Sequence, residues 1–374
     1  MIYKSDKMEK VRNREVLRMQ IRLVVGEQDR RYLDRLTMYL EKNYMNKLEI
    51  VTFSGPQLLL EYLSRQTADV ILIDESFGLS AGELSQYGNR RLAVLSEKGN
   101  GVGTDGVRRI AKYQKTDLLY KDILDIYAEG GVRPAFCKSG SSTGRLTLVT
   151  GFSGGTGAST FAAALAKNYA LKGQKTLYLN LETTGMSSSF FSGSGAYHFE
   201  DVIFALKSQR TDISLKLESA ARQDASGVYY FEPCTNAMYM LEMKKEDILK
   251  VLDALAAGAG YDSIIVDMDF RLSQEILEIM NRMSRIIVVQ DGGETSNSKF
   301  LRTMEALRIL EQQSEIHVSG AIELLYNRFS SSSSSNEIPN ISVPVIGKIP
   351  PIKHATGKEI IDYMLTRQEI FKTL

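Results

Sequence analysis

The sequence predicts an α/β protein of two domains, each built on a doubly wound parallel sheet. Short apolar strands alternate with amphipathic helices along both halves of the chain, and a Gly/Ser-rich stretch interrupts this pattern at residues 130–145. A glycine-rich turn also stands between a strand and a helix at residues 150–158. Alternation of this kind implies parallel strands, because each helix returns the chain to the same end of the sheet.

The size and composition are those of an ordinary globular protein. The 374 residues suffice for two hydrophobic cores, with 43% of them hydrophobic and 24% charged. A net charge of +1 gives no reason to expect nucleic acid or an anionic membrane as a partner. The sequence contains no apolar run long enough to span a bilayer, its first residues are polar and basic, and Cys137 and Cys234 have no paired spacing. We therefore expect a cytoplasmic protein.

The first predicted domain spans residues 21–129 and follows a basic leader at residues 1–20. Strands are expected where apolar and β-branched residues cluster, and helices where apolar residues recur at helical spacing. Pro56 suits the first turn of a helix. The expected strands are 21–25, 48–53, 68–74, 92–95 and 107–111, and the expected helices are 30–44, the segment from Pro56 onward, and 116–128.

This domain resembles a response-regulator receiver domain, which has a flavodoxin-like fold. Such a domain carries a phosphorylatable aspartate at the end of its third strand, where Asp74 stands, and an acidic pair after the first strand, where Glu27 is the single acid. Ser96 and Lys112 match the family's hydroxyl and lysine positions, although the segment between them is short for a helix and a strand. The resemblance implies a degenerate phospho-acceptor site or a docking module. The missing carboxylate weakens a Mg²⁺ site and favours the docking module.

The second predicted domain spans residues 146–374, after a linker at 130–145. Its expected strands are 146–149, 175–179, 227–231, 260–267, 285–289 and 316–326. Its expected helices are 158–170, 198–208, 211–221, 244–257, 271–282 and 294–313, with a closing helix that ends at residue 374. The repeated pattern again predicts a parallel sheet with helices on both faces.

The glycine-rich turn of the second domain is the main candidate site. Residues 146–149 run into Thr150, and Ser159 lies at the start of the apolar helix that follows the turn. Glycines let backbone N–H groups approach a phosphate closely, and the helix dipole adds positive potential. The residues of the turn suit either of two kinds of ligand. One is the phosphate chain of an ATPase nucleotide, and the other is a dinucleotide, because Thr150-Gly151 with Gly155 and Gly157 spells TGxxxGxG.

Features elsewhere in the chain favour the nucleotide of an ATPase. A short-chain dehydrogenase needs a tyrosine four residues before a lysine, and here only Tyr3 has that spacing, ahead of the loop. Glu182 alone, as a possible ligand of a ribose hydroxyl, is weak support for a dinucleotide. Asp267 instead ends an apolar strand at Walker B distance, where it would bind Mg²⁺ through water while Ser159 supplies the loop hydroxyl.

Residues 146–374 resemble the MinD/ParA family of ATPases, whose deviant Walker A loop reads K-G-G-x-G-K-[ST]-T. Residues 153–160 match this loop position by position, and residues 347–350 match the family's G-x-I-P segment. The resemblance implies that Ser159 and Asp267 hold Mg²⁺, and that Glu182, in Asn180-Leu181-Glu182, orients the attacking water as the family's aspartate does. The residues implied to bind ATP are Ser153, Gly154, Gly155, Thr156, Gly157, Ala158, Ser159, Thr160, Asn327, Arg328, Ile349 and Pro350.

The loop departs from the family at both of its lysines, which are Ser153 and Ala158 here. Loss of a charge-assisted hydrogen bond worth ~1.5–3 kcal/mol weakens ATP binding by roughly tenfold to a hundredfold. In the family the first lysine reaches across a dimer, and a cation of this kind is worth ~10³–10⁵ in rate. We therefore expect the protein to bind ATP and to hydrolyse it slowly or not at all. The sequence alone does not decide whether the protein is an enzyme. Lys299, Arg328 and Lys348 are the basic residues that could replace the lost charge.

A degenerate receiver domain followed by a lysine-poor MinD/ParA-like domain resembles the TadZ/CpaE group. These proteins help to place and assemble the Tad (Flp) pilus secretion machinery, often at a cell pole. The resemblance implies a homodimer, joined through sandwiched ATP or through the receiver-like domain, with Tad pilus and secretion proteins as partners. It implies a cytoplasmic location, at a pole or peripheral to the inner membrane through partners.

The alternative function is an active ParA/MinD-type ATPase that positions DNA or other cargo. The near-neutral charge disfavours nucleic acid. Direct membrane attachment would need an amphipathic terminal helix, but acids interrupt the apolar residues of 359–374, and we expect this segment to pack on the second sheet.

Overall fold

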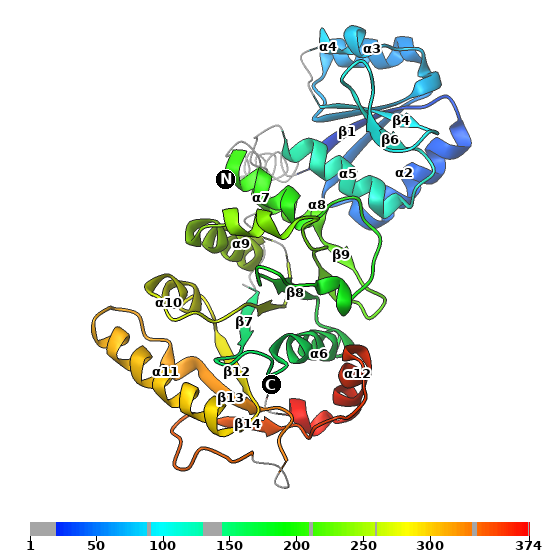
Figure 1. The fold of residues 1–374 in the computed structure, drawn as a ribbon. Coiled ribbons are helices and arrows are strands. Elements are labelled where there is room, and N and C mark those ends of the chain that lie inside the picture. The colour runs from blue at the N-terminus through cyan, green and yellow to red at the C-terminus, as the bar shows by residue number, and fades with distance from the viewer. Residues whose placement is uncertain are drawn as a thin grey trace, which may run out of the picture. The chain divides into compact units, whose positions relative to one another are not determined.

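The computed structural model describes residues 20–87, 91–129, 144–208, 212–258, 260–330, 335–372 and 374. The predicted basic leader, apart from residue 20, and most of the predicted linker lie outside these residues. The chain divides into two units, Met1–Ser139 with Lys207–Ser219 and Gly140–Leu206 with Ala220–Leu374. Each unit is an α/β fold on a mostly parallel sheet, as the sequence predicts (Figure 1).

The sheet of the first unit has the flavodoxin-like strand order β2-β1-β3-β4-β6, with β5 added at one edge. The strands are β1 (Ile21–Gly26), β2 (Leu48–Phe53), β3 (Val70–Asp74), β4 (Leu92–Ser96), β5 (Gly101–Val102) and β6 (Arg108–Ala111). All pairs are parallel except β5 with β6. The buried apolar run of β3 is typical of a strand covered on both faces.

The three helices predicted for the first domain begin where the sequence predicts. Asp29 caps α2 (Arg30–Tyr44) by accepting the N–H groups of Arg31 and Tyr32, and Pro56 is the first residue of α3 (Pro56–Arg65). Two short segments, η1 (Glu75–Phe77) and α4 (Ala81–Ser85), precede β4, and α5 (Thr116–Ala128) follows β6. The segment between β4 and β6 forms a hairpin through β5, because it is too short for a helix and a strand.

The sheet of the second unit has the order β14-β13-β12-β7-β11-β8-β10-β9. Its strands are β7 (Arg145–Thr150), β8 (Thr176–Asn180), β9 (Arg222–Gln223), β10 (Tyr229–Tyr230), β11 (Ser263–Asp267), β12 (Arg285–Gln290), β13 (Ile322–Tyr326) and β14 (Val345–Lys348). Only the edge pair of β9 with β10 is antiparallel. The carboxyl ends of β7, β8, β11 and β13 therefore lie at one edge of the sheet, which is where ligands bind in open α/β folds.

Helix α6 (Ala158–Leu171) packs on this sheet along most of its length. Residues 161–166, four of them alanine, have no exposed surface, and small side chains let a helix lie close to a sheet. Helix α12 (Gly357–Thr366) lies beside α6 and buries Ile361 and Met364 in the same core (Figure 1). The ring of Phe371 stacks on Phe161 at 6.2 Å. The predicted packing of the closing segment on the second sheet is confirmed.

The remaining elements of the second unit differ from the prediction mainly at their ends. They are η3 (Ser187–Ser189), α7 (Phe199–Ser208), η4 (Ala237–Glu242), α9 (Lys245–Gly258), α10 (Gln274–Met280), α11 (Glu294–Gln312), η5 (Ser319–Ala321) and η6 (Gln368–Phe371). The predicted strand 316–326 begins only at Ile322, because the Glu311 carboxylate accepts the N–H groups of Val318 and Ser319 and holds a turn there. Within the described ranges, none of the helices combines the length and apolar character needed to cross a membrane.

One helix predicted for the second domain lies in the first unit. Helix α8 (Ile213–Ala220) falls almost entirely within Lys207–Ser219. Leu215 belongs to the same core as α2 and α5, and the Lys216 ammonium pairs with the buried Asp125 carboxylate of α5. Helix α5 is buried along most of its length after Leu119, so it needs a covering partner that α8 supplies. The predicted segment 146–374 therefore does not form one unit by itself.

Replacement of Asp125 by asparagine is expected to destabilise the first unit at neutral pH by about 3 kcal/mol, because Lys216 and Arg108 then lose a buried anion. Burial alone would raise the pKa of Asp125, but the charges of Lys216 and Arg108 outweigh it and lower that pKa. The stabilisation is thus fully present above the ordinary value of 3.8 and is lost as the pH falls through the lower folded value. Hydrogen exchange of α5 and α8, followed with falling pH, measures both effects.

The matched control is Asp253→Asn, which removes an exposed ion pair with Arg282 at 3.1 Å. Exposed pairs contribute ~0–1 kcal/mol, so exchange should change little in this variant. Equal effects of the two substitutions would contradict a stabilising role for Asp125.

Candidate functional site

The loop between β7 and α6 has a backbone shape that its glycines impose. Gly155 and Gly157 have φ angles of 73° and 87°, in the left-handed region that favours glycine. A Cβ on Gly157 would lie 2.5 Å from Nδ2 of Asn327. That amide donates to the Thr156 carbonyl at 2.8 Å, so the loop is held from the end of β13.

A cavity of about 370 Å³ lies over this loop. Its lining consists of residues 150–160, Glu182, residues 267–270 and Arg328. The N-terminus of α6 opens into it, and free N–H groups with the positive end of the helix dipole favour an anion there. The predicted loop residues therefore lie around one cavity with the shape of a phosphate site.

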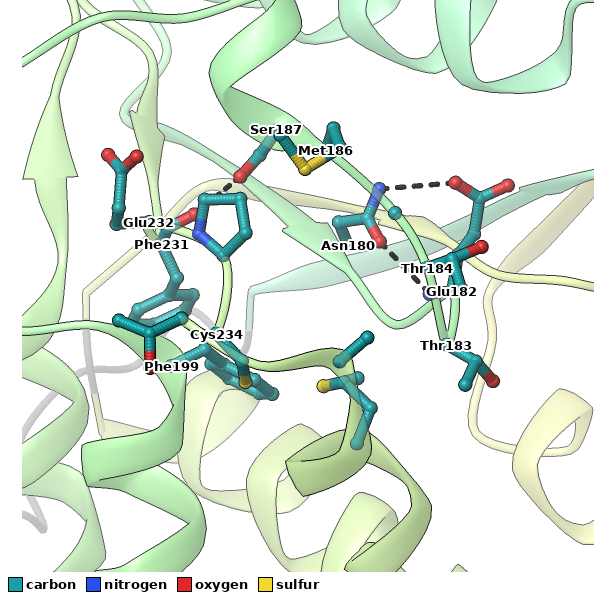
Figure 2. A pocket seen from close by; sticks show the side chains of 15 residues that line it. Asn180, Glu182, Thr183, Thr184, Met186, Ser187, Phe199, Phe231, Glu232 and Cys234 are labelled. Atoms are coloured by element: carbon teal, nitrogen blue, oxygen red, sulfur yellow. Dashed lines mark hydrogen bonds between the residues drawn. The ribbon is translucent and has the colours of Figure 1, made fainter.

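The predicted catalytic and metal-binding side chains come together beside the loop. The Ser159 hydroxyl donates to Oε1 of Glu182 at 3.1 Å. Asn180 holds Glu182 in place, because its Oδ1 accepts the Glu182 N–H at 3.0 Å and its Nδ2 lies 3.4 Å from Oε2, as Figure 2 shows.

Asp267 ends β11 with only 1% of its surface exposed. The Tyr178 hydroxyl donates to its Oδ2 at 2.6 Å, and Nδ2 of Asn180 lies 3.3 Å from the same oxygen. Burial is the largest cause that raises the pKa of Asp267, and the charge of Glu182 adds to it, so that the pKa is raised to about 7. The hydroxyl and carboxylate oxygens of the site are the ligand type that Mg²⁺ prefers.

The two positions that hold lysines in the MinD/ParA loop carry no charge here. The Ser153 hydroxyl is buried and has no hydrogen-bond partner among the described residues, which leaves a donor available to a ligand. Ala158 is the first residue of α6. Three carboxylates line the cavity, those of Glu182, Asp267 and Asp269, with Arg328 as the one basic residue of its lining. The backbone of the loop suits phosphates, and the hydroxyl and carboxylate oxygens beside it suit Mg²⁺. The loop itself has no positively charged side chain.

The remaining residues implied to bind ATP lie in different settings. Arg328 lines the cavity, whereas Asn327 is buried behind the loop, where it holds Thr156. Ile349 is fully buried in the core, with its N–H donating to the Tyr326 carbonyl at 2.8 Å. Pro350 is exposed, and neither it nor Ile349 lines the cavity.

Two further side chains lie at this site and were not predicted. Tyr178 occupies an apolar strand, so its sequence context indicates only a core residue. Asp269 follows Asp267 by two residues, and the Asp-Met-Asp pattern after a strand is a signal that could have identified it. The Thr150 hydroxyl also donates to the Met268 carbonyl at 2.7 Å, which joins the end of β7 to this segment.

A second cavity of about 210 Å³ adjoins Glu182 and is drawn in Figure 2. It lies between residues 180–187 and residues 231–240, and the Ser187 hydroxyl donates to the Phe231 carbonyl at 2.6 Å across it. Burial, and then the charge of Glu200, raise the pKa of Cys234 to about 12. Both effects favour the thiol form of Cys234 over the thiolate.

The predicted receiver residues also come together, in the first unit. The Lys112 ammonium lies 2.8 Å from Oε2 of Glu27 and 2.8 Å from Oδ2 of Asp74, and all three side chains are buried. The rings of Tyr32 and Tyr113 lie 5.1 and 5.7 Å from the same ammonium. Ser96 is buried nearby at the end of β4.

The charges of this cluster stabilise one another. Burial alone would raise the pKa of Asp74, but hydrogen bonds from Lys112 and Ser76 outweigh burial and lower it. Burial alone would lower the pKa of Lys112, but Asp74 and Glu27 outweigh burial and raise it. Asp74 is thus an ionised carboxylate with a resident ammonium counterion. Its phosphorylation stays a prediction.

Comparison with known proteins shows what most of the first unit resembles. Residues 19–128 match a family model described as TadZ-like, receiver domain. This segment is similar to TadZ-like receiver domains. The match covers well under half of the chain, and no curated protein matches the sequence.

The chain is also similar to solved structures of ATPases. A ParA family ATPase from Chlorobium tepidum TLS has 19% identity and a TM-score of 0.49, with 62% of this chain and 98% of that chain covered. MinD of Pyrococcus furiosus has 18% identity and a TM-score of 0.44, with 62% and 100% covered. MinD of Pyrococcus horikoshii OT3, solved with Mg-ADP, has 19% identity and a TM-score of 0.45, with 62% and 96% covered.

Replacement of Gly157 by alanine is expected to destabilise the second unit by at least about 1 kcal/mol. The left-handed φ and the 2.5 Å approach of Asn327 both oppose a Cβ there. Thermal unfolding, with hydrogen exchange of the loop, measures the change. Gly154→Ala is the control, because its Cβ would meet nothing within 4 Å and its φ is not positive. Equal stability of the two variants would contradict a rigid loop.

Proposed function

We propose that this protein is an ATP-binding, dimer-forming scaffold that localises the Tad (Flp) pilus assembly and secretion machinery, with slow or absent ATP hydrolysis. One observation carries the proposal. The loop at residues 153–160 keeps a backbone shape suited to phosphates, while both lysine positions are uncharged. The TadZ-like receiver domain supports the connection to the Tad machinery.

In this proposal the backbone N–H groups of residues 154–159 bind the phosphates of ATP. The Ser159 hydroxyl and Asp267 hold Mg²⁺, which supplies neutralisation of phosphate charge. Glu182 hydrogen-bonds to Ser159 and is the residue placed to orient a water molecule. Asn180 fixes the Glu182 backbone at 3.0 Å, so the carboxylate stays at the cavity while the ligand enters.

Slow hydrolysis is expected because the loop has no cation to stabilise the transition state. A cation that stabilises the transferred phosphoryl group is worth ~10³–10⁵ in rate, and Ser153 cannot supply one. Three carboxylates near the phosphates oppose the accumulation of negative charge in the transition state. ATP is therefore retained and acts as a slow switch that favours the dimer.

The receiver-like domain serves for docking in this proposal. Lys112 lies between Glu27 and Asp74, 2.8 Å from a carboxylate oxygen of each, and neutralises part of their charge. A buried ammonium with two carboxylate partners is costly to displace. The domain is thus suited to present one unchanging surface that partners recognise. In this proposal the partners are met in the cytoplasm, at a cell pole or beside the inner membrane.

Mg-ATP is expected to convert the purified full-length protein from monomer towards dimer with little phosphate release. Light scattering after size exclusion, with and without Mg-ATP, measures the mass, and a phosphate assay measures turnover. Asp267→Ala is the control, because loss of the carboxylate removes a metal ligand and should abolish the shift. Turnover above about 1 s⁻¹ would contradict the scaffold and favour the cargo-positioning ATPase. Salt-dependent retention on plasmid DNA with ATP would identify DNA as that cargo.

Restoration of both lysines, as Ser153→Lys with Ala158→Lys, is expected to raise turnover at least tenfold, because a charged donor then stabilises the transition state. The same phosphate assay measures this rate, and the single variants separate the two positions. A double variant that binds Mg-ATP more tightly without faster turnover would show that the lysines are not what limits hydrolysis.

A further inference from the structure

We infer that Arg328, two residues after β13, binds the phosphates of the nucleotide in place of the lysine that is lost at Ala158, while the charge lost at Ser153 is not replaced. The inference rests on the proposed function and deepens it. It assigns the cation to a residue outside the glycine loop and within the same subunit.

The guanidinium of Arg328 lies directly at the loop. Its Nη1 donates to the Gly155 carbonyl at 2.9 Å, and the residue lines the cavity over residues 150–160. A guanidinium is a planar group with five N–H donors, so one bond to Gly155 leaves donors available to a phosphate. Arg328 is exposed, and its side chain can adjust to a ligand.

The backbone around Arg328 is held at several points. Arg328 has a φ of 56°, which is uncommon for a residue other than glycine and costs energy unless its surroundings impose it. Asn327 is fixed on one side, with its N–H donating to the Gln290 carbonyl at 2.6 Å. On the other side, the Phe329 N–H donates to the Ile349 carbonyl at 2.9 Å. These contacts turn the chain so that Arg328 reaches the loop.

The other basic candidates are placed elsewhere. Lys348 pairs with Glu337, and its ammonium lies 5.4 Å from the ring centre of Phe329. Lys299 is an exposed residue of α11. Neither lysine lines the cavity, where three carboxylates already oppose a polyanion. Of the three residues that the sequence leaves as candidates, the geometry selects Arg328.

The test uses Arg328→Gln in the full-length protein, with titration of Mg-ATP and of a non-hydrolysable Mg-ATP analogue. Loss of a charge-assisted hydrogen bond is expected to weaken binding by roughly tenfold to a hundredfold. Addition of Ala158→Lys to this variant returns a cation to the loop and is expected to restore most of the lost affinity. Lys348→Gln and Lys299→Gln are matched controls that should bind like the unchanged protein. Thermal unfolding without nucleotide monitors folding.

The outcomes separate this inference from the proposed function. If the unchanged protein binds Mg-ATP and Arg328→Gln binds it equally well, the assignment of Arg328 is overturned and the proposed function stands. A loss that Ala158→Lys does not restore indicates a role in loop structure and also overturns the assignment. If the unchanged protein does not bind Mg-ATP, the proposed function itself fails.

Discussion

The burial of α6 is the constraint on which the site depends. The helix starts directly after the loop that leaves the central strand β7, and its alanine run lets it lie against the sheet under α12. Its N-terminus therefore cannot turn away from the cavity without loss of core packing. Asn327 holds the loop from the opposite side through the Thr156 carbonyl. A rigid set of N–H groups can bind an anion without a lysine, because no reorganisation is needed.

The charged side chains that line the cavity also affect which ligand it can bind. Three carboxylates line it, and burial and then the charge of Glu182 raise the pKa of Asp267. A divalent cation bound together with an anion would offset the charge of these carboxylates. In the receiver cluster, a side chain of the protein itself neutralises part of the charge of the carboxylates. There the ammonium of Lys112 lies between two carboxylates, and the pKa of Asp74 is lowered.

The sequence predicts most of the strands and helices, because apolar periodicity is strong in both units. It also predicts the members of the main site, since Ser159, Glu182 and Asp267 follow strands or begin a helix at one sheet edge. It does not predict Tyr178, because a buried tyrosine on a strand has the same pattern as a core residue. The choice of Arg328 over the two lysines depends on a left-handed backbone angle that no local pattern specifies.

The largest departure from the sequence prediction is α8, and its cause is packing between distant segments. Nothing in residues 207–219 indicates that Leu215 belongs with the core of α2 and α5 or that Lys216 neutralises Asp125. The chain therefore passes between the two units at 206–207 and 219–220 as well as at 139–140. Removal of the segment before residue 146 would leave α8 without the core that buries Leu215 and without the anion that pairs with Lys216. For this reason a cut at the linker does not separate the two units along the chain.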